Sequence, residues 1–408
     1  MSYEYGKPIA LVRAELEGYK KLYGQSVLEM DSMLAKVPPH PNQIDLTHGD
    51  TTAFLPPDSA FLDFAKAVER NTEAYSAYRG SSTVRNALAP RLTKLLGVEV
   101  DPVTEVIITP GTQGALYSAL SSLVGPGTIV AFPATEYFMN ERIVSYLGGE
   151  SIRIPTSISK DGYIEIEESN LLAASSQGAS VFVFSNPNNP TGGIYSRKMC
   201  EKLALWAKNS SIAVIADQLY CRLIFDGRDF TNFCALPGMK DQTVTLLGPS
   251  KTESMSGFRV GLAVAPHKLI NSMESVLSMT SLRTAGYAQH ALIHWLDKDE
   301  EWLAERIELH QEIRDYLVSG LLKIPRVEVT IPAGSSYVFP DFSKVKSVNQ
   351  NNYDDDFVLT KDLKLAGVLV SPGYQSGFNG RGHFRINFSQ HFDSIKLAVD
   401  RIRTLVQN

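Results

Sequence analysis

Residues 246–259 read LLGPSKTESMSGFR, and they place a single lysine soon after an apolar run. That run, 244–247, predicts a buried strand, and the Gly-Pro pair that follows it ends the strand. Lys251 then lies between small hydroxyl side chains, with Arg259 eight residues further on. A lysine beside buried structure and short of charged neighbours loses its proton more easily than a solvated lysine, which makes it a candidate for Schiff-base chemistry. The motif taken alone favours an ordinary loop lysine, and other segments of the chain reverse that preference.

The composition indicates a chain with a large core and a slight excess of acidic residues. Of the 408 residues, 44% are hydrophobic, which is enough to build two domains. The net charge of -5 leaves no basic footprint and argues against a nucleic-acid partner. Residues 1–5 begin no secretory signal, and no apolar segment is long enough to span a bilayer. The three cysteines lack metal-site spacing and suit a reducing compartment, so we expect a cytoplasmic protein with no metal and no membrane contact.

The spacing of apolar residues predicts an α/β fold. Apolar runs alternate with helical patterns, which predicts a mostly parallel, doubly wound sheet. The predicted strands are 105–109, 128–132, 150–154, 179–185, 211–216 and 243–247, with 262–265 as an antiparallel edge strand. Later strands are short (327–331, 336–339, 368–371 and 384–388) and a last helix starts near 394, as in an α+β domain. We expect a large domain at 58–295, a small domain at 296–408, and an amino-terminal arm at 1–57 that forms part of the small domain.

A glycine turn between a strand and a helix predicts an anion site. The strand 105–109 ends at Pro110-Gly111, and a helix begins at once with Thr112 and Gln113. Free N–H groups and the positive end of the helix dipole point outward together at such a turn. The segment lacks the GxxxxGK[ST] pattern of a nucleotide loop, so a single phosphate is the expected ligand, although an ordinary turn has the same sequence features.

Polar side chains gather where the predicted strands end. The strand 179–185 runs into NPNNPTGG (186–193), which turn chemistry alone can explain but which also forms a rigid polar ledge with Asn189. Asp217 and Tyr220 follow the strand 211–216, and open α/β sheets bind ligands at such strand ends. Arg385 lies on an otherwise apolar strand, where it either forms a structural salt bridge or clamps a carboxylate.

In this order and at these strand ends, the residues resemble the fold-type I pyridoxal-phosphate enzymes, specifically the class I and II aminotransferases related to aspartate aminotransferase. The resemblance runs from about Ile44 to the carboxyl end. Its most specific parts are NNPTG (188–192), DQLY (217–220) and Ser250-Lys251 with Arg259. It implies the fold-type I large domain, a pyridoxal 5'-phosphate cofactor, and transfer of an amino group from an L-amino acid to a 2-oxo acid.

The resemblance also implies a role for each matching residue. Lys251 matches the lysine that holds the cofactor as an aldimine and moves the substrate proton, and Asp217 matches the partner of the pyridine nitrogen. Arg385 matches the clamp for the substrate α-carboxylate. The other implied cofactor contacts are Tyr220 and Asn189 at the ring oxygen, and Gly111, Thr112, Gln113, Ser250 and Arg259 around the phosphate. Gly49 and Asn189 match groups beside the substrate carboxylate. Tyr75 matches a tyrosine that reaches the phosphate in the neighbouring subunit, which implies a homodimer.

The sequence departs from the family pattern at three positions. The aromatic residue that stacks on the cofactor sits two residues after a proline in the family, but Thr135 occupies that position here, so we assign the role to Tyr137. Gly248 stands where many relatives carry serine or threonine, which removes one phosphate contact. Gln113 replaces a frequent lysine, and we expect it to act through its backbone only.

Several functions are compatible with these residues. The same lysine and electron sink serve a pyridoxal-phosphate lyase, decarboxylase or oxidase, and the sequence does not show which Cα bond breaks. A regulator built on this fold is disfavoured because residues before 40 carry no helix-turn-helix pattern, and a scaffold protein needs none of these side chains. The amino donor stays open. A dicarboxylate donor requires a second basic group, for which Arg79, Arg283 and His48 are candidates, although Arg283 fits a salt bridge on a helix surface better.

Overall fold

In the computed structural model, the residues that can be described are 8–16, 27–49, 52–71, 74–297, 299–346, 353, 355–376 and 380–407. Parts of the predicted arm, 1–7, 17–26 and 50–51, therefore lie outside the described residues. The arm contributes helices α1 (Ile9–Leu16) and α3 (Val27–Ala35) and the short strand β1 (Ile44–Asp45). Helices α4 (Asp58–Arg70) and α5 (Ser82–Leu96) follow, and α5 is capped by Ser81, whose Oγ accepts from the N–H of Val84 at 3.3 Å.

A seven-stranded sheet forms the centre of the chain, in the order β2-β11-β10-β9-β7-β3-β4. All of its strands run parallel except β11, which is antiparallel to both neighbours. The predicted mostly parallel sheet is confirmed. Its strands are β2 (Val106–Pro110), β3 (Ile129–Pro133), β4 (Glu150–Ile154), β7 (Ala179–Ser185), β9 (Ala213–Asp217), β10 (Thr243–Leu247) and β11 (Val260–Val264).

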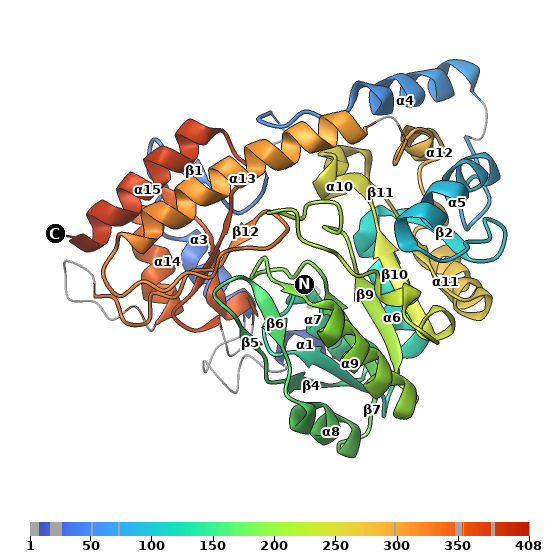
Figure 1. Cartoon of the computed structure of the whole chain (residues 1–408), viewed down its shortest axis with the longest axis horizontal. Helices are drawn as coiled ribbons and strands as arrows, with labels where there is room; N and C mark the ends of the chain where they lie inside the picture. Colours follow the sequence, from blue (N-terminus) through green and yellow to red (C-terminus); the bar gives the residue numbers. More distant parts are fainter. Residues whose placement is uncertain are drawn as a thin grey trace, which may run out of the picture.

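Helices cover both faces of this sheet because its apolar side chains alternate between them (Figure 1). On β7, Val181 and Val183 pack in the same core as α6 (Gly111–Leu123) and α11 (His267–Thr280). Phe182 and Phe184 face the other way, into the core that holds α9 (Arg197–Asn209). The sheet is therefore doubly wound, as predicted. Two further helices, α7 (Met139–Leu147) and α8 (Glu168–Ser176), complete the layers, with a small sheet of β5 (Ser157–Ile158), β6 (Tyr163–Glu165) and β8 (Ile194–Tyr195).

The carboxyl-terminal part has its own core. The long helix α13 (Glu300–Leu322) packs against α15 (Phe392–Gln407), and both lie over the antiparallel sheet β12-β15-β14 (Figure 1). Leu46, from the amino-terminal arm, belongs to this core, and β1 pairs in parallel with β13. The remaining elements are α10 (Pro249–Thr252), α12 (Gly286–Gln289), α14 (Asp356–Leu365), β12 (Tyr337–Val338), β13 (Val368–Leu369), β14 (Ser371–Pro372) and β15 (Phe384–Asn387).

Two predicted strands differ in the structure. Strand β11 is antiparallel, but it lies between β2 and β10 instead of at an edge. Residues 327–331 form no strand, because their backbone groups bond to separate partners. Glu328 pairs with Asp341 as an isolated bridge, whereas the N–H of Ile331 donates to the carbonyl of Lys160 at 3.0 Å. A single ladder cannot form with partners on two different segments.

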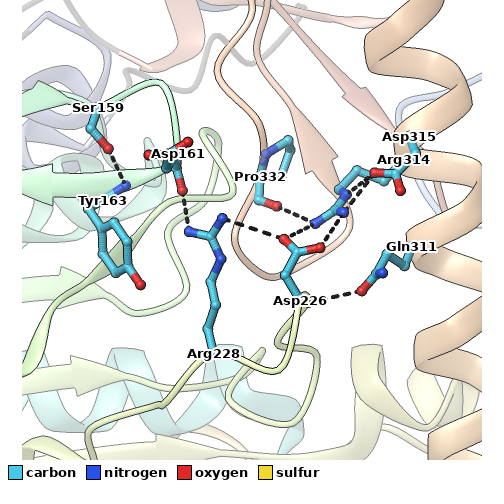
Figure 2. A network of polar contacts seen from close by, with 9 residues as sticks. All are labelled: Ser159, Asp161, Tyr163, Asp226, Arg228, Gln311, Arg314, Asp315 and Pro332. Carbon is cyan, nitrogen blue, oxygen red and sulfur yellow. Dashed lines mark hydrogen bonds and ion pairs between the residues drawn. The ribbon is translucent and has the colours of Figure 1, made fainter.

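A polar network fastens α13 to the loops that follow β9 (Figure 2). Both terminal nitrogens of Arg314 donate to the carboxylate of Asp226, at 2.8 and 2.7 Å, and one of them also reaches the carbonyl of Pro332 at 3.1 Å. Gln311 accepts from the backbone N–H of Asp226 at 2.9 Å. Arg228 lies over the ring of Tyr163, with its guanidinium carbon 5.2 Å from the ring centroid. The network ties the carboxyl-terminal elements to the large sheet.

Candidate active site

A cavity of about 340 Å³ opens at the carboxyl ends of the parallel strands. Strand ends are where open α/β sheets bind ligands. Most of the residues predicted for the site line this one cavity: Thr112, Gln113, Tyr137, Asn189, Asp217, Tyr220, Ser250, Lys251, Arg259 and Arg385. Gly49 lines an adjoining cavity of about 160 Å³, which shares Lys251, Tyr220 and Ser250 with the first. Gly111 does not line either cavity itself but lies next to Arg259, which does. Tyr75 lies on the surface, away from both cavities.

The amino end of α6 and Arg259 meet on one side of the cavity. The helix starts at Gly111 with no side-chain cap, so its first N–H groups are free. Gly111 has a φ of +69°, and a Cβ there would lie 2.5 Å from a guanidinium nitrogen of Arg259. Glycine therefore lets Arg259 approach the positive end of the helix dipole. Within the described part of the chain, no carboxylate pairs with Arg259, so two sources of positive charge meet there without a counter-ion. The arrangement fits a phosphate.

Asp217 is a carboxylate held without a cation. It ends β9, and its Oδ1 accepts from the backbone N–H of Leu219 at 3.1 Å. Burial raises the pKa of Asp217 to about 6, although that backbone hydrogen bond works in the opposite direction. Among the residues that the structure covers, no lysine, arginine or histidine forms an ion pair with Asp217. A partly buried carboxylate of this kind fits the protonated nitrogen of a bound ring.

Two tyrosines form a pair beside Lys251. The hydroxyl groups of Tyr220 and Tyr337 lie 2.5 Å apart, and both rings line the cavity. Burial raises the pKa of the Tyr220 hydroxyl. Burial also acts on Tyr337, but the positive charges of Arg385 and Lys251 outweigh it and lower the pKa of Tyr337. Tyr337 was not among the predicted site residues, and its place on β12, paired with the strand that carries Arg385, emerges only from the structure.

Arg385 is oriented by neutral groups alone. One terminal nitrogen donates to Oδ1 of Asn189 at 2.8 Å, and the other donates to the carbonyl of Thr47 at 3.1 Å and to Oγ of Ser371 at 3.0 Å. Its guanidinium carbon lies 4.4 Å from the ring centroid of Tyr337. Its Nε has no partner, and no described acidic residue pairs with it. The structure thus shows no salt bridge for Arg385 and leaves its charge available for a carboxylate.

Tyr137, and not Thr135, faces the cavity. The hydroxyl of Tyr137 donates to Oε1 of Gln113 at 3.3 Å, so the side chain of Gln113 lines the cavity through this contact. That Gln113 binds a phosphate through its backbone only stays a prediction. Burial raises the pKa of Tyr137 to about 12, which keeps its hydroxyl neutral. Thr135 lines a different and larger cavity of about 830 Å³, which contains none of the predicted site residues. The larger cavity is therefore not the one that the predicted site residues line.

Lys251 lies on α10, between the two cavities. The carbonyl of Lys251 accepts from Arg306 on α13 at 3.1 Å, which holds the short helix in place. Gly248 precedes this helix, and a Cβ there would lie 2.7 Å from Oγ1 of Thr112. The departure from serine or threonine at Gly248 thus has a steric reason, because Thr112 fills the space that a larger residue needs.

The basic candidates outside the cavity have partners of their own. Arg79 donates to the carboxylate of Glu274 at 2.9 Å and to Asn271 at 3.0 Å, and it does not reach the cavity. Arg283 lies outside any helix, and its guanidinium carbon is 5.1 Å from the ring centroids of both Tyr75 and Tyr78. The predicted helix-surface salt bridge is therefore wrong. His48 does line the cavity.

The comparisons with known proteins agree with this geometry. Residues 41–402 match the family described as aminotransferase class I and II, and the chain belongs to this family. It is 29% identical to an aspartate/prephenate aminotransferase of Cereibacter sphaeroides, over 86% of this chain and 88% of that protein. It is 26% identical to an aromatic-amino-acid aminotransferase of Thermococcus litoralis, over 85% and 87% of the two chains.

A solved structure gives the same result. The aspartate aminotransferase of Rhodobacter sphaeroides is 37% identical and superposes with a TM-score of 0.85, covering 95% of this chain and 98% of that one. The fold is thus the fold-type I architecture of pyridoxal-phosphate enzymes. The protein is a pyridoxal-phosphate-dependent aminotransferase. Of the reactions that the sequence left open, the family supports amino-group transfer over elimination, decarboxylation and oxidation. None of the described helices is long and apolar enough to cross a membrane.

Proposed function

We propose that the cavity around Lys251 is the active site, in which an L-amino acid gives its amino group to a 2-oxo acid. The observation that carries this proposal is charge left without a partner. Among the residues that the structure describes, Arg259 and Arg385 line one cavity without a paired carboxylate, and Asp217 lies there without a cation. A cofactor phosphate, a substrate carboxylate and a pyridine nitrogen would supply the three missing partners.

The residues that would hold the cofactor follow from this match. Gly111, Thr112, Gln113, Ser250 and Arg259 would bind the phosphate, Tyr137 would cover one face of the ring, and Asp217 would pair with the ring nitrogen. When bound, pyridoxal phosphate supplies an aldehyde for the amino group and a cationic ring that accepts electron density. An opposite charge at about 4 Å from Asp217 is worth roughly 4 kcal/mol at an effective dielectric of 20. That energy is enough to keep the ring protonated.

The remaining residues act on the substrate, except Tyr220, which acts on the ring oxygen of the cofactor. Arg385 binds the α-carboxylate, with Asn189 and the backbone of Gly49 beside it. Lys251 Nζ removes the proton from the substrate Cα and returns a proton to the product. Tyr220 donates toward the ring oxygen, and its raised pKa keeps its hydroxyl protonated for that purpose.

One assay tests this function. Purified protein with pyridoxal phosphate is incubated with 2-oxoglutarate and a panel of aspartate, phenylalanine, tyrosine and methionine. We expect new glutamate and the matching 2-oxo acid in equal amounts. Release of ammonia or peroxide instead would overturn the proposal. Lys251→Ala should abolish glutamate formation, whereas Arg385→Ala should mainly raise KM, by about a hundredfold for a lost charge-assisted pair.

We also infer that the active protein is a homodimer in which Tyr75 reaches the neighbouring phosphate. Tyr75 is 82% exposed, and it follows α4, which presents Phe61, Leu62 and Val68 to the outside. An exposed apolar face of this kind is typical of an interface. The rings of Phe61 and Phe64 also contact Phe258, the neighbour of Arg259, so the face adjoins the proposed phosphate site.

Two further inferences concern domains and location. Separate cores on the large sheet and around α13 support the division into 58–295 and 296–408, with the arm 1–57 adding Leu46 to the second core. Cys200, Cys221 and Cys234 are all free thiols, which supports a reducing, cytoplasmic location. Limited proteolysis and thiol titration of protein from cell extracts would test these two points.

A further inference from the structure

Glu136 is a buried carboxyl group that the proposed reaction does not use. Its side chain is 3% exposed, and it precedes Tyr137 directly. Oε1 accepts from the backbone N–H of Tyr137 at 2.8 Å and from Oγ of Ser185 at 2.5 Å. Oε2 accepts from the backbone N–H of Ser185 at 2.9 Å and from Nδ2 of Asn188 at 3.3 Å. Four donors from neutral groups thus satisfy one buried carboxyl group, and no described cation pairs with it.

These donors come from two walls of the active-site cavity. Tyr137 belongs to the segment before α7, whereas Ser185 ends β7, opposite Asp217 in the sheet register. Oγ of Ser185 accepts in turn from the backbone N–H of Asn189 at 3.1 Å. Asn189 is one of the residues that orient Arg385. The carboxyl group of Glu136 therefore lies at the junction between the aromatic wall and the wall that holds the arginine.

The sequence of this chain gives the junction a purpose. In the family pattern described above, the aromatic residue that stacks on the cofactor comes two residues after a proline. Here Thr135 fills that position, and it lines the cavity of about 830 Å³ instead. Tyr137 lies two residues later, so the segment between Pro133 and Tyr137 needs its own anchor. Thr135 contributes only its carbonyl, which accepts from Nδ2 of Asn188 at 3.3 Å. Ala134 is held from the other side, because its N–H donates to the carbonyl of Ile154 at 2.8 Å and its carbonyl accepts from Arg153 at 2.9 Å. The side-chain bonds from this segment to Ser185 and Asn188 are those of Glu136.

We propose that Glu136 is a positioning residue for the active site, which fixes Tyr137 and Asn189 relative to each other from behind the cavity. The inference rests on the proposed function, because it assigns the purpose of the anchor to the cofactor and substrate contacts of those two residues. Glu136 does not line the cavity and does not touch the reacting groups. Its effect passes through the two residues that do.

The variant Glu136→Gln tests this proposal because it keeps the shape and replaces one acceptor oxygen by a donor. Both oxygens of Glu136 face N–H groups, so the new NH2 group must meet one of them. At pH 8, where Glu136 is mainly a carboxylate, we expect binding of pyridoxal phosphate to the apoprotein to weaken by about tenfold, the worth of one charge-assisted hydrogen bond. In the fully loaded protein we expect a changed visible circular dichroism of the cofactor, which reports the surroundings of the ring. KM for the amino acid should rise through Asn189 and Arg385.

Asp226→Asn is the matched control, because it makes the same carboxylate-to-amide change in the network of Figure 2, away from the cavity. It should lower the melting temperature and leave both the cofactor affinity and the circular dichroism unchanged. If Glu136→Gln behaves like this control, Glu136 is merely structural and the proposal is wrong. If Glu136→Gln does not fold, Ser185→Ala takes its place, because it removes one donor to Glu136 and the acceptor for Asn189.

The outcome can be separated from a failure of the proposed function. Wild-type protein that forms no glutamate with any donor contradicts the function itself. Wild-type activity that depends on Lys251, together with unchanged cofactor binding in Glu136→Gln and Ser185→Ala, contradicts only the role of Glu136.

Discussion

At the scale of single residues, buried carboxyl groups link the site to pH. Burial raises the pKa of Glu136 from 4.5 to about 7 in the folded protein, in spite of its hydrogen bonds to Ser185 and Tyr137. The folded state then binds more protons than the unfolded state between these two values. Its contribution to stability is complete below pH 4.5 and is lost as the pH rises through 7.

The prediction is a difference between two pH profiles. Between pH 5 and pH 8, wild-type apoprotein should lose on the order of 3 kcal/mol of unfolding free energy through Glu136, and Glu136→Gln should not. Urea unfolding at both pH values measures the change. Groups that do not interact with Glu136 contribute equally to both proteins, including His310, whose pKa burial lowers to about 3. Parallel profiles for the two proteins would contradict the prediction.

A second prediction concerns the aromatic residue over the cofactor. Tyr137→Ala should weaken binding of pyridoxal phosphate by about tenfold, since an aromatic pair is worth about 0.5–1.5 kcal/mol beyond its buried area. Thr135→Ala should leave that affinity unchanged, because Thr135 lines the other cavity. Titration of apoprotein with the cofactor gives both values. If Thr135→Ala weakened cofactor binding more than Tyr137→Ala, the residue over the cofactor ring would be Thr135, at the position that the family pattern favours.

The sequence predicted which residues line the cavity where a short motif and a strand end coincide. Lys251, Asp217, Asn189 and Arg385 each follow or occupy a strand with a clear apolar pattern. Tyr337 and Glu136 escaped because their importance depends on contacts far along the chain, with Tyr220 and with Ser185. A single sequence carries no direct record of such pairs.

At the scale of elements, the approach of β11 to the amino end of α6 controls the anion pocket. A Cβ on Gly261 would lie 2.4 Å from the backbone nitrogen of Thr112 and 2.6 Å from the carbonyl carbon of Gly111. Both are backbone atoms, so Gly261→Ala must push the helix away from the strand. We expect phosphate to protect the apoprotein from heat less well in this variant, with a stability loss of about 1–3 kcal/mol.

Gly257→Ala is the control for that substitution. Gly257 lies near Arg259 in the chain, and no atom of the described residues lies within 4 Å of a Cβ added there. It should leave both the stability and the protection by phosphate close to wild type. Equal protection in the two variants would show that the contact between α6 and β11 does not shape the pocket.

The bounds of a strand were predictable where its own residues are apolar and buried. The strand 179–185 was predicted with the bounds that the structure gives, because its continuous apolar run is covered on both faces. The edge position of β11 and the strand at 327–331 were wrong for one reason. Both depend on which segment supplies the partner backbone, and periodicity describes only the strand itself.

At the scale of the whole molecule, the proposed dimer makes each active site a joint product of two chains. In such a dimer, Lys251 comes from one chain and Tyr75 from its partner. A variant that lacks Lys251 and a variant that lacks Tyr75 can then complement each other. Mixed dimers of Lys251→Ala and Tyr75→Ala would contain one site with neither substitution and one site with both.

This gives the last prediction. Tyr75→Ala alone should lower activity about tenfold at limiting cofactor, through the loss of a hydrogen bond to a charged group. Co-refolding it with Lys251→Ala should restore about half of the wild-type activity to each mixed dimer, because one of its two sites is intact. The control pairs Lys251→Ala with Asp217→Asn. One chain would supply both Lys251 and Asp217 to a given site, so each site of the mixed dimer carries one of the two substitutions and neither site is intact. Recovery in the control, or none in the test pair, would show that Tyr75 does not serve the neighbouring site.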